Sequence, residues 1–213
     1  MRIHTTLNPV AYQTTYYLEN DSHLLVIDPG SDWDTIEKTI RRLDKPVAAI
    51  LLTHTHYDHI MSLEKVRAAF GQPPVYVAES EASWLYTPEM NLSGLDRHAD
   101  LDNVVCQPAE EHFRYESPYQ LAGFSFFVLP TPGHSIGGVS LVFPESRLVL
   151  TGDALFRETI GRTDLPTGNY QDLIEGIKQQ LFSLPDDYAV YPGHGPATSI
   201  GHEKSHNPHF QGN

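Results

Sequence analysis

One short segment constrains this chain more than any other, because it holds three histidines and an aspartate within six residues: His54, His56, Asp58 and His59. The segment directly follows Val47 to Leu52, an apolar run after a proline that is typical of a strand buried on both faces. After Asp58, apolar residues recur at helical spacing as far as Phe70, so the segment occupies a strand-to-helix turn. Ligand-type side chains at the end of such a strand predict a metal centre.

The spacing within the segment predicts how its side chains are used. His54 and His56 are two residues apart, so in extended backbone they share a face. The turn that follows can bring Asp58 and His59 around a second ion. A solvated histidine-rich loop is the alternative, and the rest of the chain argues against it.

Three later segments repeat one arrangement, in which a strand-like run and a glycine or proline precede a single histidine or aspartate. These segments end at His134, Asp153 and His194. Imidazole and carboxylate ligands suit zinc, but they also suit iron and manganese. The residues therefore predict borderline divalent metals without selecting one element.

The motifs resemble those of the metallo-β-lactamase superfamily, and most of all its small single-domain bacterial hydroxyacylglutathione hydrolases of the glyoxalase II type. The resemblance covers essentially the whole chain, including Thr151 to Gly168 and Tyr191 to Thr198. It implies an α/β (α+β) fold, a four-layer αββα sandwich. It also implies two divalent metal ions, with zinc placed before iron or manganese. The implied ligands are His54, His56 and His134 for one ion, Asp58, His59 and His194 for the other, and Asp153 as the bridge.

The same resemblance implies a metal-dependent hydrolase. The expected reaction is thioester hydrolysis of S-lactoylglutathione or a related acyl thiol by a metal-bridging hydroxide, with Asp58 and Asp153 as the catalytic carboxylates. A thiolate, whose conjugate acid has a pKa of about 8.5, can leave without a dedicated general acid. The alternatives are a persulfide dioxygenase with a single iron, a lactonase or other ester hydrolase of the same fold, a β-lactamase, and a metal-binding module without catalysis.

Two further residues are candidates for substrate binding. In larger glyoxalase II enzymes a basic residue after a glycine helps to bind the glutathione carboxylate, and Gly161-Arg162 resembles that pair. An arginine can hold a carboxylate bidentately. The alternative is a pair between Arg162 and Asp164 that only makes the loop rigid. Tyr57 lies between ligands, where it either borders the pocket or packs.

The length and composition are those of one globular domain. A chain of 213 residues with 40% hydrophobic content can bury one large core, and no linker separates two halves. We therefore expect a single domain over residues 1–213, without the C-terminal helical glutathione-binding domain of the larger enzymes. Strands are expected near Arg2 to Leu7, Thr14 to Glu19 and His23 to Asp28, helices from Ser31 and over Tyr170 to Phe182, and a helix followed by loops over Ser80 to Tyr115.

The charge of the chain excludes some partners. Fourteen basic and 27 acidic residues give a net charge of -13 without a basic run, which argues against nucleic acid. No basic leader and no membrane-length apolar run are present in the sequence, so we expect a cytoplasmic protein without a membrane partner. The partner that the resemblance implies is a small-molecule thioester substrate. The sequence leaves the oligomeric state open. The single cysteine, Cys106, is predicted to be a packed hydrophobe rather than a nucleophile.

Overall fold

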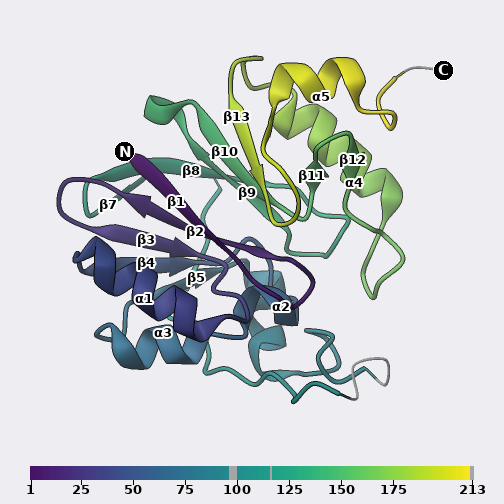
Figure 1. Cartoon of the computed structure of the whole chain (residues 1–213). Helices are drawn as coiled ribbons and strands as arrows, with labels where there is room; N and C mark the ends of the chain where they lie inside the picture. Colours follow the sequence, from purple (N-terminus) through teal and green to yellow (C-terminus); the bar gives the residue numbers. More distant parts are fainter. Residues whose placement is uncertain (96–99, 116, 212–213) are drawn as a thin grey trace. The chain divides into compact units, whose positions relative to one another are not determined.

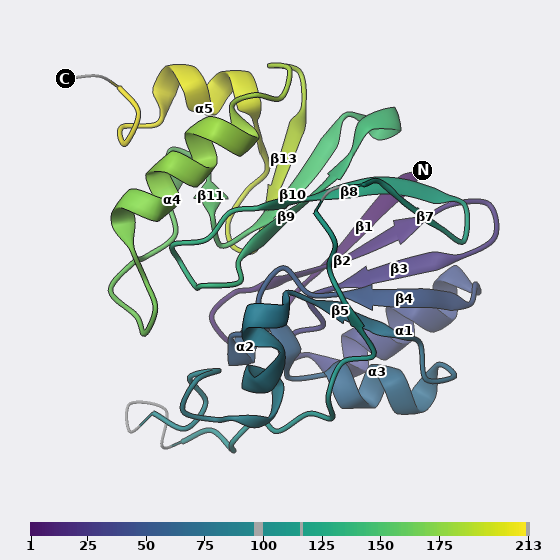
Figure 2. The same cartoon turned by 180° about the vertical axis from the view of Figure 1, so that it is seen from behind.

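The computed structural model describes residues 1–95, 100–115 and 117–211. It divides into two compact units, the first made of Met1–Phe113 with Leu121–Phe124 and the second of Arg114–Gln120 with Ser125–Asn213. Each unit is built on a six-stranded sheet (Figures 1 and 2). The prediction of one domain over residues 1–213 stays a prediction.

The first unit carries a mixed sheet whose strands follow one another in chain order. Its first three strands pair antiparallel, and the remaining ones pair parallel from β3 onward. Because β3 and β4 are parallel, the residues that follow them, Asp28 and the histidine-rich segment, leave the sheet at the same edge. The strands are β1 (Arg2–Leu7), β2 (Thr14–Glu19), β3 (Leu24–Ile27), β4 (Val47–Leu51), β5 (Val75–Val77) and β6 (Glu111–His112).

Two helices of this unit lie beside the sheet, α1 (Trp33–Leu43) and α3 (Leu63–Ala69) (Figure 1). Their apolar residues belong to the same buried cluster as the strand residues. Ile36 and Ile40 of α1 are fully or almost fully buried in the same cluster as the strand residues. The expected start at Ser31 is displaced by two residues, because Asp32 is the N-cap and its side chain accepts a hydrogen bond from the Thr35 amide.

The helix expected to run through Ile60 to Phe70 is broken. The structure has α2 (Tyr57–Ile60) and α3, with Met61 and Ser62 between them. The amide of Ser62 donates to the carbonyl oxygen of Pro29 at 3.0 Å instead of continuing the α2 ladder. The apolar spacing is compatible with both arrangements, so the pattern alone could not show the break.

The second unit carries the other large sheet, in the order β14-β13-β10-β9-β8-β7. Since β8 and β10 both pair antiparallel with β9, and β13 pairs parallel with β10, the ends of β8, β10 and β13 lie at one edge. The strands are β7 (Tyr119–Leu121), β8 (Phe124–Pro130), β9 (Val139–Phe143), β10 (Leu148–Gly152), β13 (Ala189–Pro192) and β14 (Thr198–Ser199), and a small hairpin adds β11 (Leu155–Phe156) and β12 (Thr159–Ile160).

Helical segments cover one face of this second sheet. The α4 helix (Tyr170–Gly176) continues into a π-helical turn at Ile177–Leu181, so the predicted helix over Tyr170 to Phe182 is present with a change of winding. Leu173 of α4 and Ile200 of α5 (Ile200–His206) are fully buried against strand residues of the sheet. A short 3-10 turn, η3 (Pro144–Ser146), connects β9 and β10.

The segment Ser80 to Tyr115 begins, as predicted, with a helical element, but it contains the two-residue strand β6 near its end, where the sequence predicted loops. The element is a 3-10 helix, η1 (Glu79–Tyr86), and it starts directly after β5. Residues 96–99 of the predicted loop lie outside the described part of the chain.

Candidate metal centre

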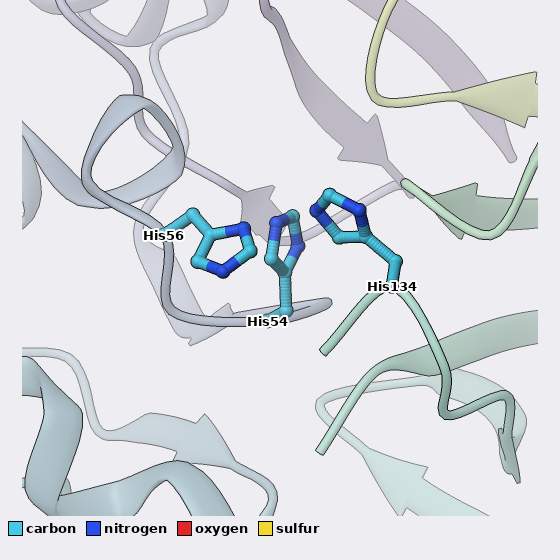
Figure 3. Close-up of side chains that lie close together, drawn as sticks. All are labelled: His54, His56 and His134. Carbon is cyan, nitrogen blue, oxygen red and sulfur yellow. The ribbon is translucent and has the colours of Figure 1, made fainter. Parts of the chain in front are cut away.

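The first group of ligand-type side chains lies in the loop between β4 and α2 and within α2 itself. His54, His56, Asp58 and His59 are all buried. The ring centroids of His54 and His56 lie 4.7 Å apart, and those of His54 and His59 lie 4.1 Å apart. Figure 3 shows the His54 and His56 imidazoles side by side on this loop. The structure thus brings together the side chains that the sequence places within six residues.

Asp28 fixes both ends of this loop from the neighbouring strand. One carboxylate oxygen accepts from the Thr53 amide at 2.8 Å, and the other accepts from the Thr53 hydroxyl at 2.6 Å and from Nδ1 of His59 at 3.0 Å. Because a carboxylate only accepts, Nδ1 of His59 carries the proton and Nε2 is left with its lone pair. Asp28 therefore fixes the orientation of the His59 ring.

The second group of ligand-type side chains lies in the second unit, at the sheet edge where β8, β10 and β13 end. His134, the third side chain drawn in Figure 3, follows β8, Asp153 follows β10 and His194 follows β13. The Nε2 atoms of His134 and His194 lie 3.5 Å and 3.3 Å from Oδ2 of Asp153. One carboxylate oxygen thus lies close to both imidazoles.

The hairpin after Asp153 supports this second group. Nδ1 of His134 donates to the carbonyl oxygen of Arg162 at 2.8 Å, which leaves Nε2 on the side of Asp153. A Cβ atom on Gly161 would overlap the carbonyl oxygen of Asp153 and would come within 3.2 Å of His134 Nδ1. Glycine is therefore required for the hairpin to approach the ligands so closely.

The distances within each group suit a shared divalent ion. Nε2 of His59 lies 3.7 Å from Oδ2 of Asp58, and the distances to Asp153 are 3.3 and 3.5 Å. These separations are longer than an ordinary hydrogen bond. Two ligands of a tetrahedral ion with bonds of about 2.0–2.1 Å lie roughly 3.3–3.4 Å apart. The imidazole and carboxylate donors therefore fit divalent metals.

The comparisons with known proteins agree with this donor set. The profile of the Metallo-beta-lactamase superfamily matches residues 8–194. The chain belongs to the metallo-β-lactamase superfamily. It is 62% identical over 210 residues to a probable metallo-hydrolase of Streptococcus pyogenes serotype M6, over 99% of this chain and 90% of the relative. It is 32% identical to the hydroxyacylglutathione hydrolase GloC of Haemophilus influenzae, over 89% of this chain and 88% of that protein.

Solved structures confirm the predicted fold class of this superfamily member. The BLEG-1 B3 metallo-beta-lactamase matches with a TM-score of 0.93 at 36% identity, over 99% of this chain and 100% of that one. TTHA1623 in a di-iron-bound form matches with a TM-score of 0.83 at 33% identity, over 95% and 97% of the two chains. The chain is accordingly a metal-dependent hydrolase with the mixed α/β metallo-β-lactamase fold.

The candidate substrate residues of this metallo-hydrolase have defined surroundings. The Arg162 guanidinium pairs bidentately with Asp164, with both N–O distances at 2.7 Å, and this carboxylate raises the pKa of Arg162. The loop-stiffening pair that the sequence left open is thus present, while substrate binding by Arg162 stays a prediction. Tyr57 is half-buried, and its amide donates to the carbonyl oxygen of Asn91 at 2.8 Å. Its place beside substrate also stays a prediction.

Cys106 is buried, as predicted, among the apolar residues of the first unit. Burial raises the pKa of its thiol to about 12. A thiol with such a pKa stays protonated near neutral pH and is a poor nucleophile. Throughout the described ranges, no helix is both long and apolar enough to cross a membrane.

Proposed function

We propose that this metallo-hydrolase is a thioesterase of the glyoxalase II type, acting on S-lactoylglutathione or a related acyl thiol. The observation that carries the proposal is the full donor set, divided between a loop after β4 and three strand ends of the second sheet. The similarity to GloC, named a hydroxyacylglutathione hydrolase, supports this substrate class. The donors are His54, His56, Asp58, His59, His134, Asp153 and His194.

We assign these donors to two divalent ions. His54, His56 and His134 would hold one ion, Asp58, His59 and His194 would hold the other, and Asp153 would contribute to both. When bound, such ions lower the pKa of a water toward neutrality and polarise a carbonyl oxygen. Zinc is the first choice for these ligand types, with iron or manganese as alternatives.

Residues of this chain would orient the histidine ligands and offset the charge of the ions. Asp28 and the Arg162 carbonyl hold protons on Nδ1 of His59 and His134, so each ring keeps Nε2 for a ligand bond. The carboxylates of Asp58 and Asp153 offset the positive charge that the ions bring into a buried place. The departing thiolate needs no protonated side chain, since its conjugate acid has a pKa of only about 8.5. Cys106 takes no part, because its thiol is buried and protonated.

A substrate panel tests this function on the purified, metal-replete chain. The panel contains S-lactoylglutathione or another acyl-glutathione, a simple thioester, a lactone and a β-lactam. We expect kcat/KM to be largest for the acyl-glutathione. The β-lactam is included because BLEG-1, a B3 metallo-beta-lactamase, is so similar in structure. Oxygen uptake with glutathione persulfide is measured in parallel. Efficient β-lactam or lactone hydrolysis without thioester turnover, or oxygen uptake by an iron-loaded chain, would replace the thioesterase assignment.

The Arg162→Ala variant tests how the thiol carrier is bound. Loss of a bidentate contact to the carboxylate should raise KM for an acyl-glutathione roughly ten- to a hundredfold, with kcat largely retained. A thioester without that carboxylate should be unaffected. The Asp164→Asn variant is the matched control, because it breaks the same pair but leaves the guanidinium available to substrate. If both variants impair both substrates alike, the pair serves only to make the loop rigid.

A further inference from the structure

Glu81 lies on η1 and contacts the loop between β4 and α2 that carries His54 and His56, which we call the ligand loop. Its side chain is fully buried, and Oε2 accepts hydrogen bonds from the Thr55 amide at 2.8 Å and from the Thr55 hydroxyl at 3.0 Å. Thr55 lies between His54 and His56 in the chain. A buried carboxylate thus holds the backbone at the point from which both imidazoles extend.

Trp84, one turn further along η1, contacts the same loop. Its ring is buried and stacks on the imidazole of His56, with centroids 6.2 Å apart and planes 19° apart. The carbonyl oxygen of Trp84 accepts from the Asn91 side chain at 2.9 Å, and that of Leu85 accepts from the Cys106 amide at 2.7 Å. The 3-10 helix is therefore also held by the segment that follows it in the chain.

Glu81 and Asp28 form hydrogen bonds with different residues of the ligand loop. Asp28 binds Thr53 and His59, whereas Glu81 binds Thr55, so the alternate residues 53 and 55 are each held by a buried carboxylate. His54 lies between these two residues, so a displacement of its backbone would disturb the contacts on either side. Residues that hold metal-binding side chains in place reduce the rearrangement needed when those side chains bind an ion.

We propose that Glu81 is a positioning residue for the metal-ligand loop, fixing His54 and His56 through Thr55, with Trp84 holding the ring of His56. This inference rests on the proposed assignment of both histidines as ligands. It adds a supporting residue from outside the motif, at a distance of 26 positions along the chain.

The affinity of the full chain for Zn²⁺, measured by chelator competition, tests this role. Glu81→Ala should weaken Zn²⁺ binding roughly ten- to a hundredfold, the loss typical of removing an outer partner of a ligand. Glu81→Gln should restore affinity close to that of the wild type, because an amide oxygen can accept both Thr55 bonds. Thr55→Val keeps the amide contact and should show a smaller loss than Glu81→Ala. An unchanged affinity in both Thr55→Val and Glu81→Ala overturns the proposal.

Glu19→Ala is the matched control for general destabilisation. Glu19 is also a buried carboxylate of the first unit, but it binds His4, Lys45 and Arg2 rather than the ligand loop. It should lower the unfolding temperature of the metal-free chain while leaving Zn²⁺ affinity unchanged. If Glu81→Ala gives that same result, Glu81 is merely structural and the proposal is wrong.

Amide exchange in the metal-free chain separates this inference from the proposed function. Exchange at the Thr55 amide should speed up in Glu81→Ala and stay slow in Glu19→Ala, since only the first loses its acceptor. If the wild-type chain binds no Zn²⁺, the proposed function fails, while faster Thr55 exchange would still show that Glu81 fixes the loop. Unchanged exchange in Glu81→Ala would reject the positioning role whatever the metal content.

Discussion

The Asp153→Ala variant should lose thioester turnover together with metal. The Oδ2 atom of Asp153 lies within 3.5 Å of Nε2 in both His134 and His194, so its removal takes a carboxylate from the middle of a ligand group. It also removes a negative charge that would offset the mutual repulsion of two ions. Loss of a direct ligand should exceed the roughly ten- to hundredfold effect of losing an outer partner. Elemental analysis and kcat/KM on the same sample measure both effects.

The folded state of the metal-free Asp153→Ala chain should be at least as stable as that of the wild type. A carboxylate that is mostly buried is costly to keep out of water, and alanine removes that cost. The unfolding temperature after chelation therefore controls for misfolding, and Asp153→Asn tests whether the charge rather than the size is needed. Near-normal turnover in either variant would contradict the assignment of Asp153 as a shared ligand.

The second large effect is expected for Asp28→Ala. The change leaves the Thr53 amide and Nδ1 of His59 buried without their acceptor, at a cost of about 1–3 kcal/mol for each unsatisfied group. Asp28 also adopts a left-handed backbone with φ of 51°, which aspartate and asparagine tolerate better than alanine. Urea unfolding should show a loss of about 2–6 kcal/mol for the two groups together, and Zn²⁺ affinity should fall roughly ten- to a hundredfold.

Asp28→Asn separates the backbone effect from the hydrogen bonds to His59. Asparagine keeps the left-handed conformation and one acceptor oxygen, so most of the stability should return. Its amide nitrogen cannot accept a hydrogen bond, so the Thr53 hydroxyl and Nδ1 of His59 lose the acceptor that Oδ2 provides, and metal affinity should recover only in part. If Asp28→Ala is as stable and binds Zn²⁺ as tightly as the wild type, Asp28 does not orient His59.

Local patterns predicted the elements that carry the proposed ligands. The apolar run Val47 to Leu52 contains β4. A strand also precedes each of His134, Asp153 and His194, because at each place a short β-rich run ends at a glycine or proline. The second sheet places the ends of β8, β10 and β13 at a common edge, which is why His134, Asp153 and His194 form a compact group although they lie far apart in the sequence. These features depend on short-range periodicity and on parallel pairing.

The supporting contacts could not be predicted in the same way. The hydrogen bond from His134 to the Arg162 carbonyl uses a backbone oxygen, so the side chain at position 162 does not reveal it. Glu81 is one of many acidic residues in the chain, and its contact with Thr55 spans an irregular segment. The break between α2 and α3 was missed because the apolar spacing continues across it. Each of these features is set by tertiary contacts rather than by local spacing.

The number of metal ions per chain tests the proposed centre most directly. The purified wild-type chain is saturated with Zn²⁺, dialysed against metal-free buffer, and assayed for protein and metal on the same sample. The proposed ligand set predicts two ions per chain, falling toward zero in Asp153→Ala. A reproducible value of one, unchanged when Asp58 and His59 are replaced by alanine, would contradict the two-ion centre.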